Sequence, residues 1–456
     1  MGKIIKLYTT DPTWYDGKAI SVPQFCQEFL RERHLAYVGN SFFTEDGLLS
    51  DLSILRRQIF EELAPYVKSG VSRKIDNIVN LLKLQARVDD QPPQTDRIHV
   101  LNGTLYLDGT FTKEKNETVR SRFPVRYDPD AKPPERWLKF LSELLWPEDI
   151  PTVQEFIGYC LIPSNAGQKM LLIKGNGGEG KSQIGNLLSV LFGINAKNGS
   201  VAKVSENQFA RADLEHIHLM IDDDTRLEAL KQTNYVKSIV TAKGKMDLER
   251  KGQQSYQGWM TARIMAFSNG NLASLYDQSD GFFRRQLILE TKRKPQDRID
   301  DPFLSEKFCE ELEGIFLWAF EGLQRLVKNH FQFTVSDRAR LVWETVKKEA
   351  NNIELFMDST GYIIRGSDHS ASTKKLYDTY CSWCDANAYS PVKQKTFSAH
   401  LNANTEKYGI QSTNHLFDAR GKEVRGYKGI SSIVYPSGCI SEELQEVNSD
   451  GIPFMD

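Results

Sequence analysis

Eight consecutive residues, 175–182 (GNGGEGKS), have the composition and spacing of a loop that binds phosphate groups. They match the pattern G-x-x-x-x-G-K-[ST], in which glycines let backbone N–H groups surround the phosphates, the lysine neutralises the β and γ charges and the hydroxyl binds Mg²⁺. The pattern predicts a nucleoside triphosphate and Mg²⁺ as ligands. The candidate nucleotide ligands are Gly175, Asn176, Gly177, Gly178, Glu179, Gly180, Lys181 and Ser182, and Ser182 is also a candidate metal ligand.

The segments on either side of this loop have the character that a phosphate-binding loop requires. Before it, 169–174 (KMLLIK) predicts a buried strand. After it, apolar residues at helical spacing predict a helix with one buried face. Since the motif is diagnostic between a strand and a helix, this context favours nucleotide binding over the alternative, a glycine-rich turn without a ligand.

Three aspartates follow a second apolar segment, 216–221 (HIHLMI), and could support hydrolysis of a bound nucleotide. One carboxylate in such a position can hold Mg²⁺ while its neighbour polarises the attacking water. We assign Asp222 to the metal and Asp223 to the water, with Asp224 as a third candidate. The alternative is a solvated turn.

Two further groups could act on the γ-phosphate. Asn269 follows a predicted buried strand, 264–267 (IMAF), and its amide could orient the attacking water. Arg284 and Arg285 follow an aromatic turn, GFFRR. Paired arginines are often surface charges, but in a ring-shaped ATPase a guanidinium can stabilise the transition state in the neighbouring subunit.

Length and composition set the frame for these groups. The chain has 456 residues, which at roughly 150 per domain suggests about three folding units. Its 58 basic and 60 acidic residues give a net charge of -2, which excludes a polycation, and 40% hydrophobic with 26% charged residues is typical of globular proteins. The six cysteines are too sparse for a disulfide scaffold. Cys381 and Cys384 share an apolar helical face, so we interpret them as core residues and not as zinc ligands.

No apolar stretch reaches 18 residues, and the N-terminus lacks the apolar core of a signal peptide. We therefore expect a cytoplasmic protein without a membrane partner.

Amphipathic helical patterns fill the first 90 residues, and the proline-containing segment 89–96 (DDQPPQTD) marks a boundary. Short strands are predicted within 98–127, and strands alternate with helices from 168 to about 289. Near the C-terminus, two helices (374–387 and 394–402) and a hairpin around Gly421 predict a winged helix.

Taken together, these motifs resemble the ATPase core of superfamily 3 helicases, the AAA+ type found in viral initiators. They are most similar to the primase-helicase C-terminal family of phages, plasmids and phage satellites, and to replication initiators of the pathogenicity-island type. The matching motifs are GNGGEGKS, IDDD, AFSN and GFFRR. RFPVRYDP, WLKFLSELL and FIGYCLIP resemble the domain that this family carries before its phosphate loop, and 376–401 (LYDTYCSWCDANAYSPVKQKTFSAHL) resembles its winged helix. The resemblance covers about residues 95–435.

The resemblance implies a homo-hexameric ring that hydrolyses ATP between subunits and moves along single-stranded DNA, 3′ to 5′. It implies that Lys181 and Ser182 bind phosphate and Mg²⁺, that Asp222 and Asp223 form the acidic pair, and that Asn269 is a sensor. Arg284 lies fifteen residues after Asn269, which favours it over Arg285 as the arginine finger. Many members carry a primase upstream; residues 1–95 have neither its carboxylate cluster nor zinc ligands, so we expect no primer synthesis.

Basic residues in two regions are candidate DNA ligands. The family places a DNA-binding hairpin between the acidic pair and the sensor, here 243–253, with Lys251 at the tip as the best contact. Residues 360–435 contain ten Lys or Arg and six Asp or Glu, a balance of +4 that suits duplex DNA. In both regions a solvated basic surface is the alternative. The candidates are Lys243, Lys245, Arg250 and Lys251 in the hairpin, Lys393 and Lys395 on the second helix, and Arg420, Lys422 and Arg425 in the wing.

The predicted fold is an α/β AAA+ P-loop ATPase core with a mixed or helical N-terminal region and a C-terminal winged-helix domain. The predicted domains are a helical domain (1–92), a family-specific domain (93–163), the ATPase and helicase domain (164–345), the winged helix (355–435) and a disordered acidic tail (436–456). We expect an ATP-dependent DNA helicase and replication initiator of a mobile element, whose winged helix recognises duplex origin DNA. The alternative is a nucleotide-switched protein that binds or loads on DNA without translocating; a small-molecule kinase explains neither Arg284 nor the winged helix.

Overall fold

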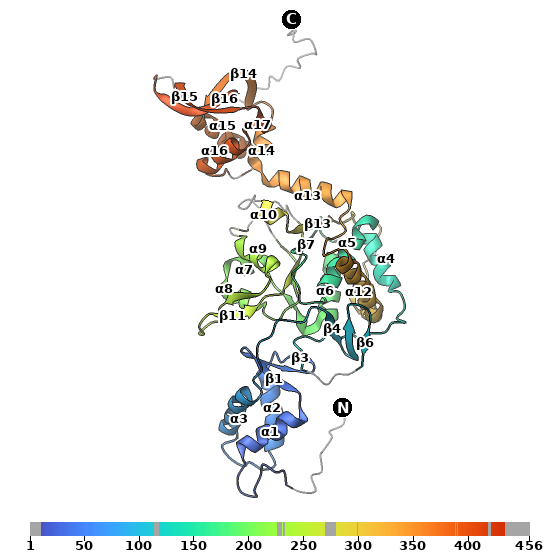
Figure 1. The fold of residues 1–456 in the computed structure, drawn as a ribbon. Helices are drawn as coiled ribbons and strands as arrows, with labels where there is room; N and C mark the ends of the chain where they lie inside the picture. Colours follow the sequence, from blue (N-terminus) through green and yellow to red (C-terminus); the bar gives the residue numbers. More distant parts are fainter. Residues whose placement is uncertain are drawn as a thin grey trace. The chain divides into compact units, whose positions relative to one another are not determined.

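The fold comes from a computed structural model that describes residues 11–113, 118–225, 230, 233–269, 280–298, 300–387, 389, 391–417 and 421–433 (Figure 1). The chain divides into two compact units, 1–347 and 348–456, which are described separately. Within the described ranges, no helix combines the length and the apolar character needed to cross a membrane.

The N-terminal part of the first unit packs three helices around one apolar core. These are α1 (Val22–Glu32), α2 (Leu52–Leu63) and α3 (Val71–Gln85), and each buries the apolar positions that helical spacing predicts. The region also contains a small antiparallel sheet that the helical patterns did not predict, formed by β1 (Leu35–Val38), β2 (Ser41–Thr44) and β3 (Gly47–Leu48). Its strands are short and joined by tight turns, so they carry little periodicity.

The segment after residue 96 forms the predicted strands and helices. A three-stranded antiparallel sheet consists of β4 (Arg97–Val100), β5 (Gly103–Tyr106) and β6 (Phe111–Thr112). The predicted turn at Asp108 is present, because Gly109 has a positive φ of +93° and its N–H donates to the carbonyl of Tyr106. The elements that follow are α4 (Glu135–Leu144), the 3₁₀ turn η1 (Pro147–Asp149) and α5 (Ile150–Tyr159).

A five-stranded parallel sheet forms the centre of the first unit, which makes its class mixed α/β as predicted. Its strand order is β13-β7-β12-β9-β8, and every pairing is parallel. The strand that precedes the phosphate loop, β7, therefore lies between the last strand and β12, and β12 separates it from β9. The strands are β7 (Met170–Lys174), β8 (Ala196–Asn198), β9 (Leu219–Asp222), β12 (Arg263–Ser268) and β13 (Gln286–Glu290).

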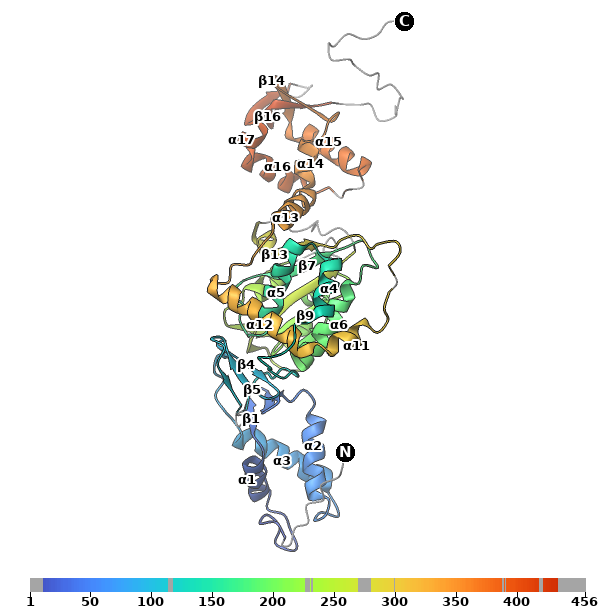
Figure 2. The ribbon, with the colours of Figure 1, turned by 90° about the vertical axis from the view of Figure 1, so that its right-hand side faces the viewer.

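Helices cover both faces of this sheet, which explains why its strands are apolar on both sides. Figure 1 shows α6 and α12 on one side of the sheet and α7 and α9 on the other, and Figure 2 looks onto the first side. The first face is covered by α4, α5, α6 (Lys181–Phe192), α11 (Leu304–Cys309) and α12 (Leu312–Lys328). The turn η2 (Gly193–Asn195) follows α6, and the other helices are α7 (Val201–Glu206), α8 (Gln208–Ala212), α9 (Asn234–Thr241) and α10 (Asp280–Phe283).

A separate two-stranded hairpin lies between α9 and β12 in the sequence. It consists of β10 (Lys245–Leu248) and β11 (Tyr256–Trp259), paired antiparallel, and Gly252 in its connecting turn has a φ of +75°. The hairpin predicted over 243–253 is therefore present, and its second strand extends to Trp259.

The second unit combines helices with a three-stranded antiparallel sheet in the order β14-β16-β15. Both predicted helices and the hairpin around Gly421 are present. The first strand of the sheet was not predicted, because β14 is an edge strand whose residues are mostly polar and exposed. The elements are α13 (Asp337–Ala350), which crosses the division between the units, α14 (Asn352–Met357), β14 (Ile363–Ser372), α15 (Thr373–Ala386), α16 (Gln394–Ala403), α17 (Thr405–Tyr408), β15 (Gln411–Phe417) and β16 (Glu423–Ser432).

Candidate nucleotide-binding site

A cavity of about 700 Å³ opens at the carboxyl edge of the parallel sheet, where β7, β9 and β12 end. This volume lies within the range of small-molecule sites, and this edge is where open α/β sheets bind ligands. Its walls come from the phosphate loop, the start of α6, the ends of β9 and β12, α4, and the segment before α11. The polar and charged residues that line it include Lys181, Ser182, Asp223, Asn269 and Arg298.

The phosphate loop has a backbone shape that its glycines make possible. Gly177, Gly178 and Gly180 have φ values of +100°, +79° and +104°, which other residues rarely adopt. Gly175 is needed for a different reason, because a Cβ there would lie 2.5 Å from the Nζ atom of Lys181. The loop ends at α6, which has no side-chain cap at Gly180, so its first N–H groups are available to an anion.

Lys181 is almost fully buried, and two oxygen atoms hold its ammonium group in place. It donates to Glu179 Oε2 at 2.8 Å and to Asn269 Oδ1 at 2.7 Å. The buried carboxylate of Glu179 also accepts the backbone N–H groups of Asn176 and Gly177. Burial by itself raises the pKa of Glu179, but the hydrogen bonds from Lys181 and the loop outweigh it and the pKa is lowered. Glu179 therefore remains a carboxylate and orients Lys181.

The sheet brings the predicted sensor next to the predicted phosphate ligand. In the parallel ladder between β12 and β7, Ser268 is level with Lys174, so the residues that follow both strands leave the sheet side by side. Asn269 is thereby placed in contact with Lys181. Since β12 also pairs with β9, the same strand stands between the phosphate loop and the aspartates.

The two neighbouring aspartates, Asp222 and Asp223, lie in different surroundings. Of the described residues that line the cavity, Asp223 is one and Asp222 is not. Asp222 is buried on the opposite face of the sheet, where Oδ2 accepts the N–H of Val201 and the hydroxyl of Thr225, both at 2.7 Å. Asp223 is exposed in the cavity that Ser182 also lines. The geometry therefore favours Asp223 as the metal-side carboxylate.

Alternation along β9 explains this difference. Leu219 and Ile221 point into the core under α6, and a Cβ on Gly185 of α6 would lie 3.2 Å from the Ile221 side chain. Successive residues of a strand face opposite sides, so Asp222 must point away from α6 and Asp223 toward it. Asp224, the third candidate, is exposed, and the described cavity lining does not include it.

Arg298 is a residue of this site that the sequence analysis missed. Its guanidinium donates to the carbonyl oxygens of Glu179 at 2.7 Å and Gly178 at 3.4 Å, and to the Asp300 carboxylate at 2.8 Å. It thus bridges the phosphate loop and the segment before α11 while lining the cavity. It belongs to no motif and follows the loop by more than a hundred residues, so no local pattern indicates its role.

Neither Arg284 nor Arg285 is among the described residues that line this cavity. Arg285 folds back and donates to the carbonyl of Gly281. Arg284 is exposed directly after α10. Of the two, Arg284 has the position from which a side chain can reach another molecule.

The structure divides the four basic hairpin candidates into two pairs. Lys245 forms an ion pair with Asp90 at 2.7 Å and Arg250 one with Glu215 at 2.9 Å. Lys243 and Lys251 are exposed and form no ion pair within the part of the chain that the structure describes. The first pair is thus engaged by the protein, and the second is available to a ligand.

In the second unit, the candidate DNA ligands lie on the surface. Lys393 and Lys395 are exposed at the start of α16, and Lys422 and Arg425 are exposed on the β15–β16 hairpin. His400, which lies on the same helix, is instead turned toward the hydroxyl of Tyr408 at 2.9 Å. Arg420 and the acidic tail lie outside the described residues.

Cys384 of the CxxC segment has the surroundings of a core residue. Cys384 is fully buried on α15, where burial raises its pKa to about 11, and it packs in the same core as Tyr380 and Phe397. No cluster of three or more His, Cys, Asp or Glu able to hold a metal occurs among the described residues. Cys384 therefore lies in the core, and Cys381 on the same helix is partly buried.

Two kinds of similarity to known proteins were found. A family model described as a family of unknown function (DUF5906) matches residues 173–285. The solved structures that match include two of the NrS-1 C-terminal region without ligand. The A form is 13% identical and covers 88% of this chain and 98% of its own, with a TM-score of 0.47; the other is 12% identical, with coverages of 89% and 98% and a TM-score of 0.49.

The matched segment 173–285 contains the phosphate loop, the three aspartates, Asn269 and both arginines. Neither match identifies what this protein does, because the family is of unknown function and both structural TM-scores lie below 0.5.

Proposed function

We propose that the protein is an ATP-hydrolysing DNA helicase that initiates replication of a mobile element. The observation that carries the proposal is the arrangement around Lys181, which places a buried ammonium group, the Ser182 hydroxyl, the Asp223 carboxylate and the Asn269 amide at one cavity. A nucleoside triphosphate with Mg²⁺ is the ligand class whose charges these groups match.

Each group has a role that follows from its position. The N-terminus of α6 and Lys181 bind the phosphates. Ser182 and Asp223 would hold Mg²⁺, which neutralises negative charge on the β- and γ-phosphates. Asn269 is placed to orient the attacking water, and Glu179 keeps Lys181 in position.

We extend the proposal to the AAA+ type and to a homo-hexameric ring. Two features support it: a strand carrying the candidate sensor lies between the phosphate-loop strand and the aspartate strand, and Arg284 is exposed outside its own cavity. An arginine finger supplied by a neighbour completes a site that is otherwise open, so the ring would hydrolyse ATP only when assembled.

DNA contacts are assigned to two surfaces. The hairpin β10–β11 would contact single-stranded DNA, with movement 3′ to 5′ as the resemblance implies. The second unit, which we interpret as a winged helix, would bind duplex origin DNA through the start of α16 and the β15–β16 hairpin. The exposed Lys393, Lys395 and Arg425 support this assignment, because phosphate contacts require accessible cations.

The test of the nucleotide site compares two lysines. Lys181→Ala should reduce ATP hydrolysis by about 100-fold or more, because it removes a charge that stabilises the transition state. Lys203→Ala, at an exposed lysine of α7, is the matched control and should hydrolyse ATP at the wild-type rate. Binding of duplex DNA by folded Lys181→Ala should be unchanged. Normal hydrolysis by Lys181→Ala would refute the assignment.

A further inference from the structure

Asp90 lies in the proline-containing segment that follows α3, and its carboxylate binds three side chains from other segments. Oδ2 accepts from Lys245 Nζ at 2.7 Å, and Oδ1 accepts from Arg120 Nη2 at 2.6 Å and from Trp259 Nε1 at 3.0 Å. Lys245 and Trp259 are opposite one another in the hairpin register. One carboxylate therefore bonds both strands at the open end of the hairpin.

A second carboxylate holds the other end of the hairpin. Glu215 lies in the turn before β9, and its Oε2 accepts from Arg250 at 2.9 Å and from the Tyr256 hydroxyl at 2.6 Å. Burial, together with the hydrogen bond to Glu215, raises the pKa of Tyr256 to about 12, so it remains a donor. At Gly258 a Cβ would lie 2.5 Å from Glu215 Oε1, so glycine at this position of β11 lets the carboxylate approach.

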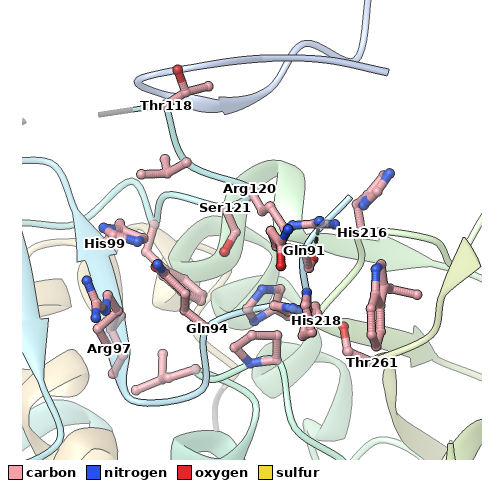
Figure 3. A pocket seen from close by; sticks show the side chains of 18 residues that line it. Gln91, Gln94, Arg97, His99, Thr118, Arg120, Ser121, His216, His218 and Thr261 are labelled. Atoms are coloured by element: carbon pink, nitrogen blue, oxygen red, sulfur yellow. Dashed lines mark hydrogen bonds between the residues drawn. The ribbon is translucent and has the colours of Figure 1, made fainter. Parts of the chain in front are cut away.

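Asp90 keeps its negative charge at neutral pH. Partial burial raises the pKa of Asp90, but the bonds from Lys245 and Arg120 outweigh it, and the pKa lies below its ordinary value. Arg120 is fixed in turn by the backbone carbonyl of Gln91 at 2.6 Å. Figure 3 shows Arg120 and Gln91 together at one end of a cavity of about 180 Å³, near His216.

We propose that Asp90 is a positioning residue that fixes the hairpin against the core. In this arrangement Lys245 and Arg250 hold the hairpin, while Lys243 and Lys251 contact the phosphates of single-stranded DNA. This inference rests on the proposed function, and it gives the boundary segment 89–96 a role.

The basic residues of the hairpin differ in whether a carboxylate of the protein already binds them. A lysine whose charge is already balanced by a carboxylate of the protein offers little net positive charge to a phosphate. The number of phosphates that a protein neutralises is measured by the salt dependence of binding, at about 0.7 in slope per contact for single strands. A residue that positions the hairpin changes affinity without changing this slope.

The experiment measures single-stranded oligonucleotide binding by the full chain at several salt concentrations. Asp90→Asn should weaken binding about fivefold, the effect of about one lost hydrogen bond, with the salt slope and the basal ATPase unchanged. Asp89→Asn is the matched control, because it makes the same charge change at an exposed neighbouring residue. Lys245→Gln should behave like Asp90→Asn, the double variant should be no weaker, and Lys245→Arg should restore binding.

Lys251→Gln is the contrasting variant and should lower the slope by about 0.7. The inference is overturned if Asp90→Asn binds like Asp89→Asn, or if Lys245→Gln lowers the slope as Lys251→Gln does. Tighter binding and a steeper slope in Asp90→Asn would also overturn it, because Asp90 would then compete with phosphate.

A second measurement does not depend on DNA. Trypsin should cleave at the hairpin tip, after Arg250 or Lys251, faster in Asp90→Asn than in Asp89→Asn, since the hairpin is less firmly held. Equal cleavage would refute positioning. If the wild type binds no single strand, the proposed function fails, whereas faster cleavage would still show that Asp90 holds the hairpin.

Discussion

The cavity that we assign to a nucleotide and the basic surfaces of this protein differ in how firmly their cations are held. In the cavity, Lys181 is buried and held by two oxygen atoms, so the site has its geometry before any ligand arrives. On the surfaces, Lys251, Lys393 and Lys395 are exposed. Chemistry on a phosphate needs groups fixed in advance, whereas contact with a nucleic-acid backbone needs charge that can adjust to it.

The hairpin combines both designs within a few residues. Lys245 and Arg250 are fixed by carboxylates, and Lys243 and Lys251 are not fixed by any described residue. A basic residue in a candidate DNA-binding segment can therefore stabilise the fold instead of contacting DNA. Its partners decide which of the two roles it has.

Arg284 is an exception to this contrast, because it is exposed although we propose that it acts on the γ-phosphate. Arg284→Ala should reduce hydrolysis by about 10³-fold, the effect of removing an arginine finger. A mixture of Arg284→Ala and Lys181→Ala chains should regain part of the activity, since some interfaces then combine an intact loop with an intact finger. Mixtures as inactive as either variant alone would count against a finger supplied by a neighbour.

Asp223 and Asp222 test which carboxylate at the end of β9 binds Mg²⁺. Asp223→Asn should raise the Mg²⁺ concentration needed for hydrolysis by about tenfold or more, because it removes a charged ligand. Asp222→Asn should change this Mg²⁺ requirement little. It should lower the free energy of unfolding by about 1–3 kcal/mol, since Asp222 accepts two hydrogen bonds in a buried position. Mg²⁺ titrations and thermal unfolding of both variants distinguish the roles, and the reverse result would restore our first assignment.

Lys251 tests whether DNA bound at the hairpin tip stimulates hydrolysis in the cavity. Lys251→Ala should keep the basal ATPase and lose most of its stimulation by single-stranded DNA, because the hairpin tip no longer engages the strand. Hydrolysis measured with and without an oligonucleotide gives both quantities. Stimulation at the wild-type level would show that the hairpin tip is a solvated turn.

The smallest effect is expected in the second unit. Lys395→Ala should weaken duplex binding a fewfold and lower its salt slope by about 0.9, the value for one phosphate contact on B-DNA. His400→Ala should leave the slope unchanged, because its ring already faces the Tyr408 hydroxyl. A slope that falls in His400→Ala and not in Lys395→Ala would invert the assignment of this helix.

The sequence predicted those features that depend on local pattern. The phosphate loop, the helix after it and the strands that carry Asp222 and Asn269 follow from glycine spacing and apolar runs. The opposite orientations of Asp222 and Asp223 could also have been predicted, since alternation along β9 separates them.

The features that were missed depend on contacts distant in sequence. Asp90 pairs with Lys245, and Arg298 reaches the phosphate loop from a segment beyond the last strand of the sheet. Neither contact leaves a periodic signal. β14 was missed because an exposed edge strand need not be apolar, and its pairing with β16 decides its conformation.

In the proposed function, ATP hydrolysis in the cavity drives the separation of DNA strands. The most direct measurement is strand displacement from a forked duplex, with Lys181→Ala and Lys203→Ala compared with the wild type. We predict displacement that requires ATP and Mg²⁺, is abolished in Lys181→Ala and is retained in Lys203→Ala. ATP-dependent DNA binding without displacement by the wild type would contradict the claim and would instead describe a nucleotide-switched loading protein.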